Sequence, residues 1–229
     1  MSRLFATGSD HLDNNNPAWT APAGTICAWI KSTSLVTPAQ IVTLGTSGSG
    51  SNRFTLGMTS GAFFVCNEND GSSSVANATS PVLDTTNWHL AVGVWSDHTN
   101  RAAFFDGLSK GTIAALKASS APNVTRISAD PAGGNPAAMY IAHVAIWNIA
   151  LIDADVLKLL TQLPSTVQAA SLLEYWPLTG NASPEPSLGT SPHTLTVTGT
   201  AFSTDNPALG ILQKSLSAGF QSLASAMQG

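Results

Sequence analysis

The residues from Met139 to Leu160 carry the clearest hydrophobic pattern in the chain. Between Tyr140 and Trp147, apolar and small residues occupy both alternating faces, which is typical of a strand that is buried on both sides. Asp153 precedes an apolar stripe at helical spacing, so it is the expected N-cap of one short helix. The buried face of this helix is predicted to consist of Val156, Leu157, Leu159 and Leu160.

Short runs rich in Val, Ile, Phe, Trp and Thr recur along the rest of the chain, with turn clusters at residues 46–51 and 69–72 between them. Asp106-Gly107 separates two such runs and predicts a hairpin, because this pair tolerates the positive φ of tight turns. A chain of 229 residues without a linker-like segment fits a single β domain. The pattern predicts an all-β fold, an antiparallel β-sandwich of the jelly-roll type.

An ordered set of segments resembles laminin-G-like domains of the concanavalin A-like lectin/glucanase superfamily. Residues 3–13 resemble the opening strand pair of this family, residues 24–32 a core strand with a Trp, and residues 172–178 a strand that returns to pair near the N-terminus. The further matching segments are residues 87–96, 101–112 and 139–160. The resemblance covers residues 3–205 and implies that residues 1–205 form one laminin-G-like sandwich.

Residues 206–229 predict an amphipathic helix outside this sandwich. Asn206-Pro207 is a favourable helix start, and apolar residues then follow at spacings of three and four. These residues are Leu209, Leu212, Leu216, Phe220, Leu223 and Met227. The helix is predicted to dock on a partner subunit or to bundle with its own copies as a homo-oligomer. Packing on its own sandwich and lying on a membrane surface remain alternatives, although Lys214 alone gives little positive charge for the latter.

The charge pattern excludes one class of partner. Only 10% of residues are charged, the formal net charge is −4 and no basic stripe occurs, so nucleic acid is not an expected partner. No run approaches the 18 or so apolar residues of a membrane-spanning helix. Cys27 and Cys66 lie inside expected strands, which favours buried free thiols over a disulfide between them.

Glu68 and Asp70 are the nearest candidates for a catalytic pair. The superfamily also includes glycoside hydrolases, and retaining enzymes use two carboxyl groups about 5 Å apart. The segment lacks the third acid and the aromatic framing of the family's catalytic strand, so we expect a solvated acidic turn at a strand end and no enzyme activity. Five scattered histidines form no nucleophile or zinc motif, and His143 is expected to be a core residue.

Glycan binding requires an aromatic platform beside hydrogen-bonding side chains. Trp19 follows the polar residues 14–18 and is the Trp least explained by a strand core. The other Trp residues lie in strand-like runs and are expected in the core: Trp29, Trp88, Trp95, Trp147 and Trp176. The family resemblance implies a concave-face glycan site flanked by Arg53, Asn67, Glu68 and Asp70.

The family resemblance also implies a Ca²⁺ site at the sandwich rim. The candidate oxygen donors are Asp10, Asp13, Asn14, Asn67, Asp70, Asp97 and Asp130. Without a fixed loop motif no set of ligands can be chosen, and capping of loops by the same residue types is the favoured alternative.

The start of the chain bears on location. Met1–Phe5 has no charged region followed by an apolar stretch, so we expect synthesis without an export signal. Release by lysis would reconcile this with a domain that faces glycans, and structural proteins of tailed bacteriophages have a similar low-charge composition. We predict a non-catalytic, exposed structural or adhesive component of a phage virion, in capsid decoration or a tail fibre. The alternatives are a free glycan-binding module and a degenerate or unusual glycoside hydrolase.

Overall fold

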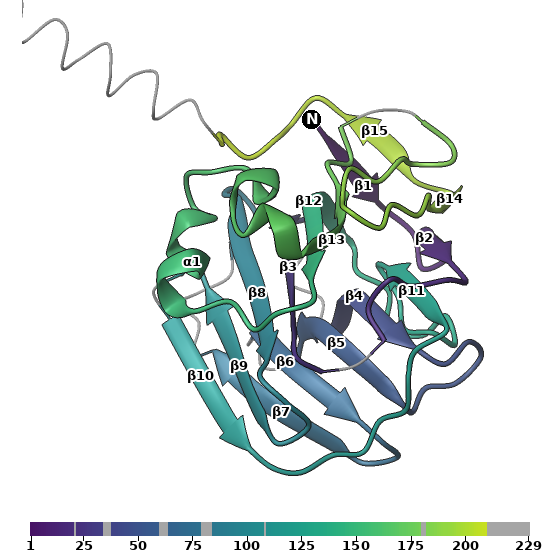
Figure 1. The fold of residues 1–229 in the computed structure, drawn as a ribbon. Helices are drawn as coiled ribbons and strands as arrows, with labels where there is room; N and C mark the ends of the chain where they lie inside the picture. The colour runs from purple at the N-terminus through teal and green to yellow at the C-terminus, as the bar shows by residue number, and fades with distance from the viewer. Residues whose placement is uncertain are drawn as a thin grey trace, which may run out of the picture.

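Two antiparallel sheets, named sheet A and sheet B, pack face to face in this protein (Figure 1). The computed structural model describes residues 1–20, 22–33, 38–59, 64–78, 84–107, 109–179 and 182–209. The predicted all-β sandwich of the jelly-roll type is confirmed, because strands distant in sequence pair antiparallel in both sheets.

Sheet A has eight strands within the described residues, and β12 pairs with three of them, β3, β1 and β13. The order along the sheet is β10 (Ser109–Ala114), β9 (Asn100–Phe105), β8 (His89–Trp95), β3 (Gly24–Ser32), β12 (Met139–Trp147), β1 (Ser2–Phe5) and β15 (Ala201–Ser203). A further strand, β13 (Leu172–Trp176), pairs with β12.

Sheet B has seven strands within the described residues. Its order is β14 (Thr196–Thr198), β2 (His11–Asn14), β11 (Val124–Ile127), β4 (Ala39–Gly45), β5 (Arg53–Met58), β6 (Phe64–Asn69) and β7 (Ser73–Ala78). The predicted opening strand pair is therefore divided between the two sheets, with β1 in sheet A and β2 in sheet B.

The space between the sheets is filled by large apolar side chains. Phe54, Phe64, Trp95 and Trp176 are fully buried there, and burial of each such side chain stabilises the fold by about 1.5–3 kcal/mol. Cys66 lies in the same cluster, whereas Cys27 lies on the other face of sheet A. Both thiols are free and buried, as predicted.

A second apolar cluster covers the outer face of sheet A. Helix α1 (Asp153–Lys158) and the 3-10 helices η1 (Pro164–Thr166) and η2 (Ala169–Ser171) lie over this face (Figure 1). Trp147 is buried in this cluster with Val156 and Leu159 of the α1 region. β12 is consequently buried on both faces, as its sequence pattern predicted.

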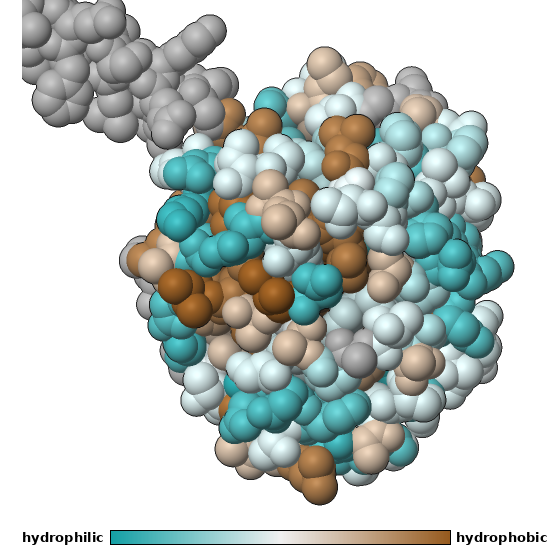
Figure 2. All heavy atoms as spheres, viewed as in Figure 1, coloured by the Kyte–Doolittle hydropathy of each residue, from teal (hydrophilic) through white to brown (hydrophobic). Residues whose placement is uncertain are grey.

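Two details of the α1 region differ from the prediction. The N-cap is Ile152 and makes no side-chain cap, because Asp153 is the first helical residue and pairs with Lys110 at 2.8 Å. Leu157 is 44% exposed because it projects away from the sheet that buries Val156. Figure 2 shows hydrophobic side chains at the surface around α1, whereas much of the same face is polar.

The strand at residues 172–178 pairs differently from the prediction. β1 pairs with residues 139–141 of β12 and β13 pairs with residues 144–147, so both lie along the same edge of β12. His143 lies between these stretches with a φ of 50°, at an irregularity of the β12 ladder. The other edge of β1 pairs with β15, so β15, and not β13, is the strand that returns to pair with the N-terminal strand.

The predicted hairpin at Asp106-Gly107 is confirmed, with φ values of 49° and 66° at these residues. Leu209, the first residue of the predicted assembly helix, packs against the second apolar cluster. The remaining residues of that stripe, Leu212, Leu216, Phe220, Leu223 and Met227, lie outside the described residues, and the division at residue 205 stays a prediction. Among the described residues, none of the helices has the length and apolar character needed to cross a membrane.

Candidate functional site

The outer face of sheet B gathers polar side chains from six neighbouring strands. Strand alternation directs Phe54 and Leu56 into the core, so Arg53 and Thr55 point outward. Register then places Arg53 opposite Asn69 on the same face. We call this surface the polar face, and its main members are Asp13, Gln40, Thr43, Arg53, Thr55, Asn67, Asn69, Ser73 and Arg126.

Two ion pairs hold the arginines of the polar face in place. Arg126 Nη2 lies 2.9 Å from Asp13 Oδ2, and Arg53 Nη1 lies 3.5 Å from Asp130 Oδ2. Burial lowers the pKa of Arg53, and the charge of Asp130 partly offsets this effect. Arg126 also donates to the backbone carbonyl oxygens of Asp130 and Pro131, so the β11–β12 loop fixes both guanidinium groups.

Several buried polar atoms of the polar face have no partner among the described residues. They are Gln40 Oε1, Arg53 Nε and Arg126 Nε. Buried polar groups in folded proteins are nearly always hydrogen bonded to protein, water or ligand. These three atoms are closed off beneath the polar face, so a ligand would meet the other polar atoms of the same side chains.

Arg53 and Asn67 are the two predicted site residues that the structure brings to one face. Thr55 lies opposite Asn67 in the register, and Asn67 Oδ1 accepts a hydrogen bond from the Ser74 backbone N–H at 3.2 Å. Asn69 completes the group, since its Nδ2 donates to Ser73 Oγ at 3.1 Å. A hydrogen-bonding surface of this kind suits ligands rich in hydroxyl groups.

The prediction that Trp19 forms an exposed platform is wrong. Trp19 is only 2% exposed, and its ring lies 4.8 Å from that of Phe54 and 5.4 Å from that of Trp95. The loop turns this side chain into the core against Gly24, where an added Cβ would lie 2.5 Å from the indole. Trp19 is therefore a core residue and cannot stack on a glycan.

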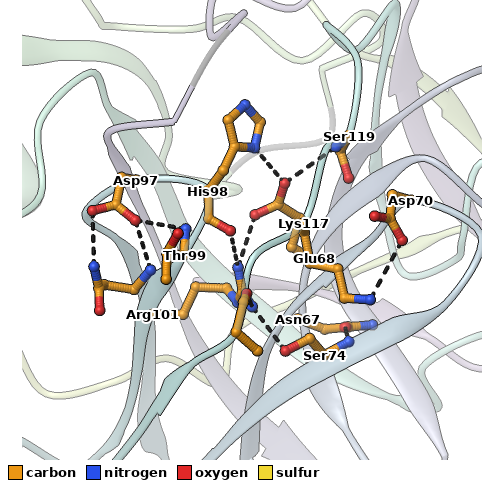
Figure 3. A network of polar contacts seen from close by, with 12 residues as sticks. Asn67, Glu68, Asp70, Ser74, Asp97, His98, Thr99, Arg101, Lys117 and Ser119 are labelled. Atoms are coloured by element: carbon orange, nitrogen blue, oxygen red, sulfur yellow. Dashed lines mark hydrogen bonds and ion pairs between the residues drawn. The ribbon is translucent and has the colours of Figure 1, made fainter.

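Glu68 faces the opposite side of sheet B from Asn67 and lies between the sheets (Figure 3). Its Oε2 accepts from Arg101 Nη1 of β9 at 3.0 Å, and its Oε1 accepts from His98 Nδ1 at 2.6 Å and from the Ser119 backbone N–H at 3.4 Å. The side chains of Glu68 and Arg101 are both 0% exposed. Glu68 is therefore neither a solvated acid nor part of a glycan surface.

Arg101 connects this acid to three further segments of the chain. It donates to the backbone oxygens of His98 and Ala115 and to Ser74 Oγ, at 2.9, 2.6 and 2.8 Å respectively (Figure 3). We call Glu68, Arg101, His98 and Ser74 the inter-sheet clamp, because it ties β6 and β7 of sheet B to β9 of sheet A.

Asp70 lies beyond the clamp, in the exposed turn after β6. It accepts from the Ser72 backbone N–H at 3.3 Å and pairs with Lys117 Nζ at 3.4 Å, and these contacts, led by the Ser72 bond, lower its pKa to about 2. Because Glu68 is sealed inside the sandwich, the two acids share no cleft. The arrangement lacks the pair of accessible carboxyl groups that glycoside hydrolysis needs.

Several candidate calcium donors cap loops instead. Asp10 accepts from the Ala6 and Thr7 backbone N–H groups, Asp97 accepts from those of Thr99 and Asn100, and Asp130 accepts from those of Ala132 and Gly134. This is the loop-capping alternative that the sequence favoured. Within the described ranges, no group of three or more His, Cys, Asp or Glu side chains is placed to hold a metal ion.

Sequence reasoning missed Gln40, Asn69 and Arg126 of the polar face. Asn69 could have been found, because the turn at residues 69–72 fixes the β6–β7 hairpin and strand alternation then places Asn67 and Asn69 on one face. Arg126 carries no comparable local signal. Its place on this face depends on the pairing of β11 with β2 and β4, which are distant in sequence.

Jelly-roll sandwiches occur in lectin domains and in viral capsid proteins. The family model of the concanavalin A-like lectin/glucanases superfamily matches residues 6–157, and the chain belongs to this superfamily. A comparison with curated proteins gave no significant match.

Solved structures with the same fold include a native heptameric SAP-like pentraxin from Limulus polyphemus, with a TM-score of 0.60 and 14% identity over 87% of this chain and 92% of that chain. A putative carbohydrate binding protein from Bacteroides ovatus has a TM-score of 0.65 and 14% identity, over 91% of this chain and 61% of that chain. The CBM40 of a Ruminococcus gnavus IT-sialidase, bound to alpha2,3 sialyllactose, has a TM-score of 0.56 and 13% identity, over 69% of this chain and 95% of that chain. At these identities the likeness establishes the fold.

Proposed function

We propose that this chain is a non-catalytic carbohydrate-binding domain that binds glycan on the polar face of sheet B. The observation that carries the proposal is the gathering of amide, hydroxyl and guanidinium side chains from neighbouring strands on one outer sheet face. Membership of a lectin superfamily supports it, as does the fold shared with a solved putative carbohydrate binding protein. The burial of Glu68 in the inter-sheet clamp supports a non-catalytic role.

The chemistry of the polar face favours a neutral glycan. Each arginine on this face already has a carboxylate partner, Asp130 for Arg53 and Asp13 for Arg126, so little net charge remains for an ionic ligand. The side-chain amides of Asn67 and Asn69 carry both donors and acceptors for sugar hydroxyls. Recognition would then depend on hydrogen bonds more than on aromatic stacking.

The test is glycan-array screening of the full chain, followed by calorimetry with the best glycan. Asn67→Ala and Arg53→Met are each expected to weaken binding about tenfold or more, because one lost hydrogen bond with a desolvated partner costs about 1–3 kcal/mol. Asn148→Ala, which removes an exposed amide just after β12 of sheet A, is the matched control and should not change affinity. Unchanged binding by both polar-face variants, or no binding to any arrayed glycan by the folded chain, would refute the proposal.

The wider role that we propose is that of an exposed component of a larger assembly, a phage virion protein in capsid decoration or a tail fibre. The low charge content and the apolar stripe that begins at Leu209 support this role. Exposed apolar side chains of Ile152, Leu157 and Leu163 in the α1 region offer further contact surface for a subunit of the same assembly.

Assembly is tested by the mass in solution of the full chain beside a version that ends at Leu209. A homo-oligomer that becomes a folded monomer on truncation would support an assembly role for residues 210–229. Two monomers of equal stability would contradict it, and the free glycan-binding module would then be the better description.

A further inference from the structure

Large apolar side chains gather on the surface around helix α1 (Figure 2). Ile152 precedes the helix and is 65% exposed, Leu157 lies within it at 44%, and Leu163 follows it at 42%. Seven large hydrophobic side chains are exposed among the residues that the structure describes, and these three fall within twelve consecutive positions. Single exposed apolar residues need no explanation, but a cluster of them marks an interaction surface.

The outward face of α1 is apolar at its centre and charged at its ends. Two of the six helical residues are buried, and the other four are exposed: Asp153, Ala154, Leu157 and Lys158. Ala154 and Leu157 are three positions apart, so they are neighbours on the helix surface. Asp153 begins this face and Lys158 ends it, which gives the two ends opposite charges.

Contacts with the β9–β10 hairpin hold this face in position. Asp153 pairs with Lys110 of β10 at 2.8 Å. Leu157 lies over Gly107 of the turn, where an added Cβ would be 3.0 Å from Leu157 Cδ2. The outward face of α1 is therefore attached to sheet A before any partner arrives, and a partner would not have to order it on binding.

We propose that the outward face of α1 is a two-fold contact between copies of this chain. In an antiparallel pair of α1 helices that cross at their midpoints, Ala154 lies opposite the partner's Leu157, and Asp153 lies opposite the partner's Lys158. A two-fold interface requires a surface that is complementary to itself. This face meets the requirement twice, because a large apolar side chain faces a small one and an acid faces a base.

The charges favour a second copy over an acidic or a basic partner. The side chains of Asp153 and Lys158 remain 63% and 50% exposed, so each can take part in a further ion pair. A partner of one charge sign would be attracted at one end of the helix and repelled at the other. The contact is smaller than a standard protein interface, so it would act together with other contacts of the assembly. This inference rests on the proposed assembly role, for which it names the partner and the residues that meet.

The test is sedimentation equilibrium of the full chain and of two charge-reversal variants, Asp153→Lys and Lys158→Glu. Each variant alone places like charges opposite each other at both ends of the contact, so the dissociation constant of its self-association should rise about tenfold. An equal mixture of the two should associate as well as the parent chain, because every mixed pair has opposite charges at both ends. A role of these side chains within one copy would not produce rescue by mixing.

A second variant tests the apolar centre of the contact. Leu157→Glu places a charge there and should raise the dissociation constant about tenfold or more. Leu116→Glu is the matched control, because Leu116 is an exposed leucine in the loop after β10, at the other end of that strand from Lys110, and association should not change. If Leu157→Glu disturbs the fold, Ala154→Glu replaces it with the same expected loss.

The inference is overturned if the full chain stays a monomer at every concentration, if mixing the charge-reversal variants gives no rescue, or if Leu157→Glu associates as well as Leu116→Glu. An oligomer that is lost on truncation at Leu209 but is unchanged by Leu157→Glu would overturn this contact and leave the assembly role of residues 210–229 standing. An oligomer that is weakened by Leu157→Glu and survives truncation would support this contact and contradict that role.

Discussion

The buried ion pair of Glu68 and Arg101 in the inter-sheet clamp gives the sharpest stability prediction. Arg101→Met would leave Glu68 as a buried carboxylate with only His98 and the Ser119 backbone N–H as partners. Removing one partner of a buried ion pair typically costs about 3–5 kcal/mol. At about 2–4 °C per kcal/mol for a domain of this size, the melting temperature should fall by about 6–20 °C.

The assay is urea unfolding followed by tryptophan fluorescence, supported by thermal melting. Lys110→Met is the matched control, because Lys110 and Asp153 approach to 2.8 Å but both are exposed. Its cost should stay below about 1 kcal/mol, since solvent screens such pairs. The two variants therefore compare ion pairs of similar length that differ in burial.

A double-mutant cycle separates the interaction free energy of Glu68 with Arg101 from the cost of leaving one buried charge without a partner. Glu68→Leu combined with Arg101→Met should cost clearly less than the sum of the two single changes, because neither residue is then left as an uncompensated ion. If Arg101→Met costs no more than Lys110→Met, or if the two single costs simply add, the reasoning about the clamp is refuted.

Two histidines make predictions about pH. Burial lowers the pKa of His143 to about 4, so the unfolded chain binds the proton at a higher pH than the folded chain does. The stability of the fold should therefore fall as pH decreases from about 6.5 toward 4. In a pH series of urea unfolding midpoints, His143→Asn should flatten this fall, and Asn tolerates the positive φ at this position. Burial also lowers the pKa of His89, but the hydrogen bonds and charges of Asp106 and Asp84 outweigh it and the net pKa is raised. His89 should therefore add stability that is present below about pH 6.5 and lost as pH rises through its folded pKa, and His89→Gln should remove that dependence in the same measurement.

The sequence predicted best what local pattern determines. β12 was recognisable because its own residues alternate on two buried faces, and the hairpin at Asp106-Gly107 because the turn needs positive φ. The role of Glu68 was not recognisable, since acids beside a Ser-rich turn resemble a solvated loop. Its partner Arg101 comes from β9 of the other sheet, so only the packing of sheet B on sheet A reveals the pair.

The misplacement of Trp19 has a related cause. A polar loop around a Trp suggests exposure, but the space left by Gly24 allows the ring to enter the core. Within the predicted glycan site, strand alternation alone separates Asn67 from Glu68. Arg53 joins Asn67 only through the register of β5 with β6, whereas Arg126 joins through strands from distant parts of the chain.

The pairing of β1 with β15 has a consequence for synthesis of the chain. Ser2 lies opposite Ser203 in this ladder, and Arg3 forms a buried ion pair with Glu185. On the ribosome, β1 is synthesised long before β15, so the edge of β1 that pairs with β15 stays unpaired until β15 has been made. An unpaired strand edge of this kind is a template for aggregation. Because the pairing comes late, the nascent protein should depend on chaperones to protect this edge until β15 pairs with it.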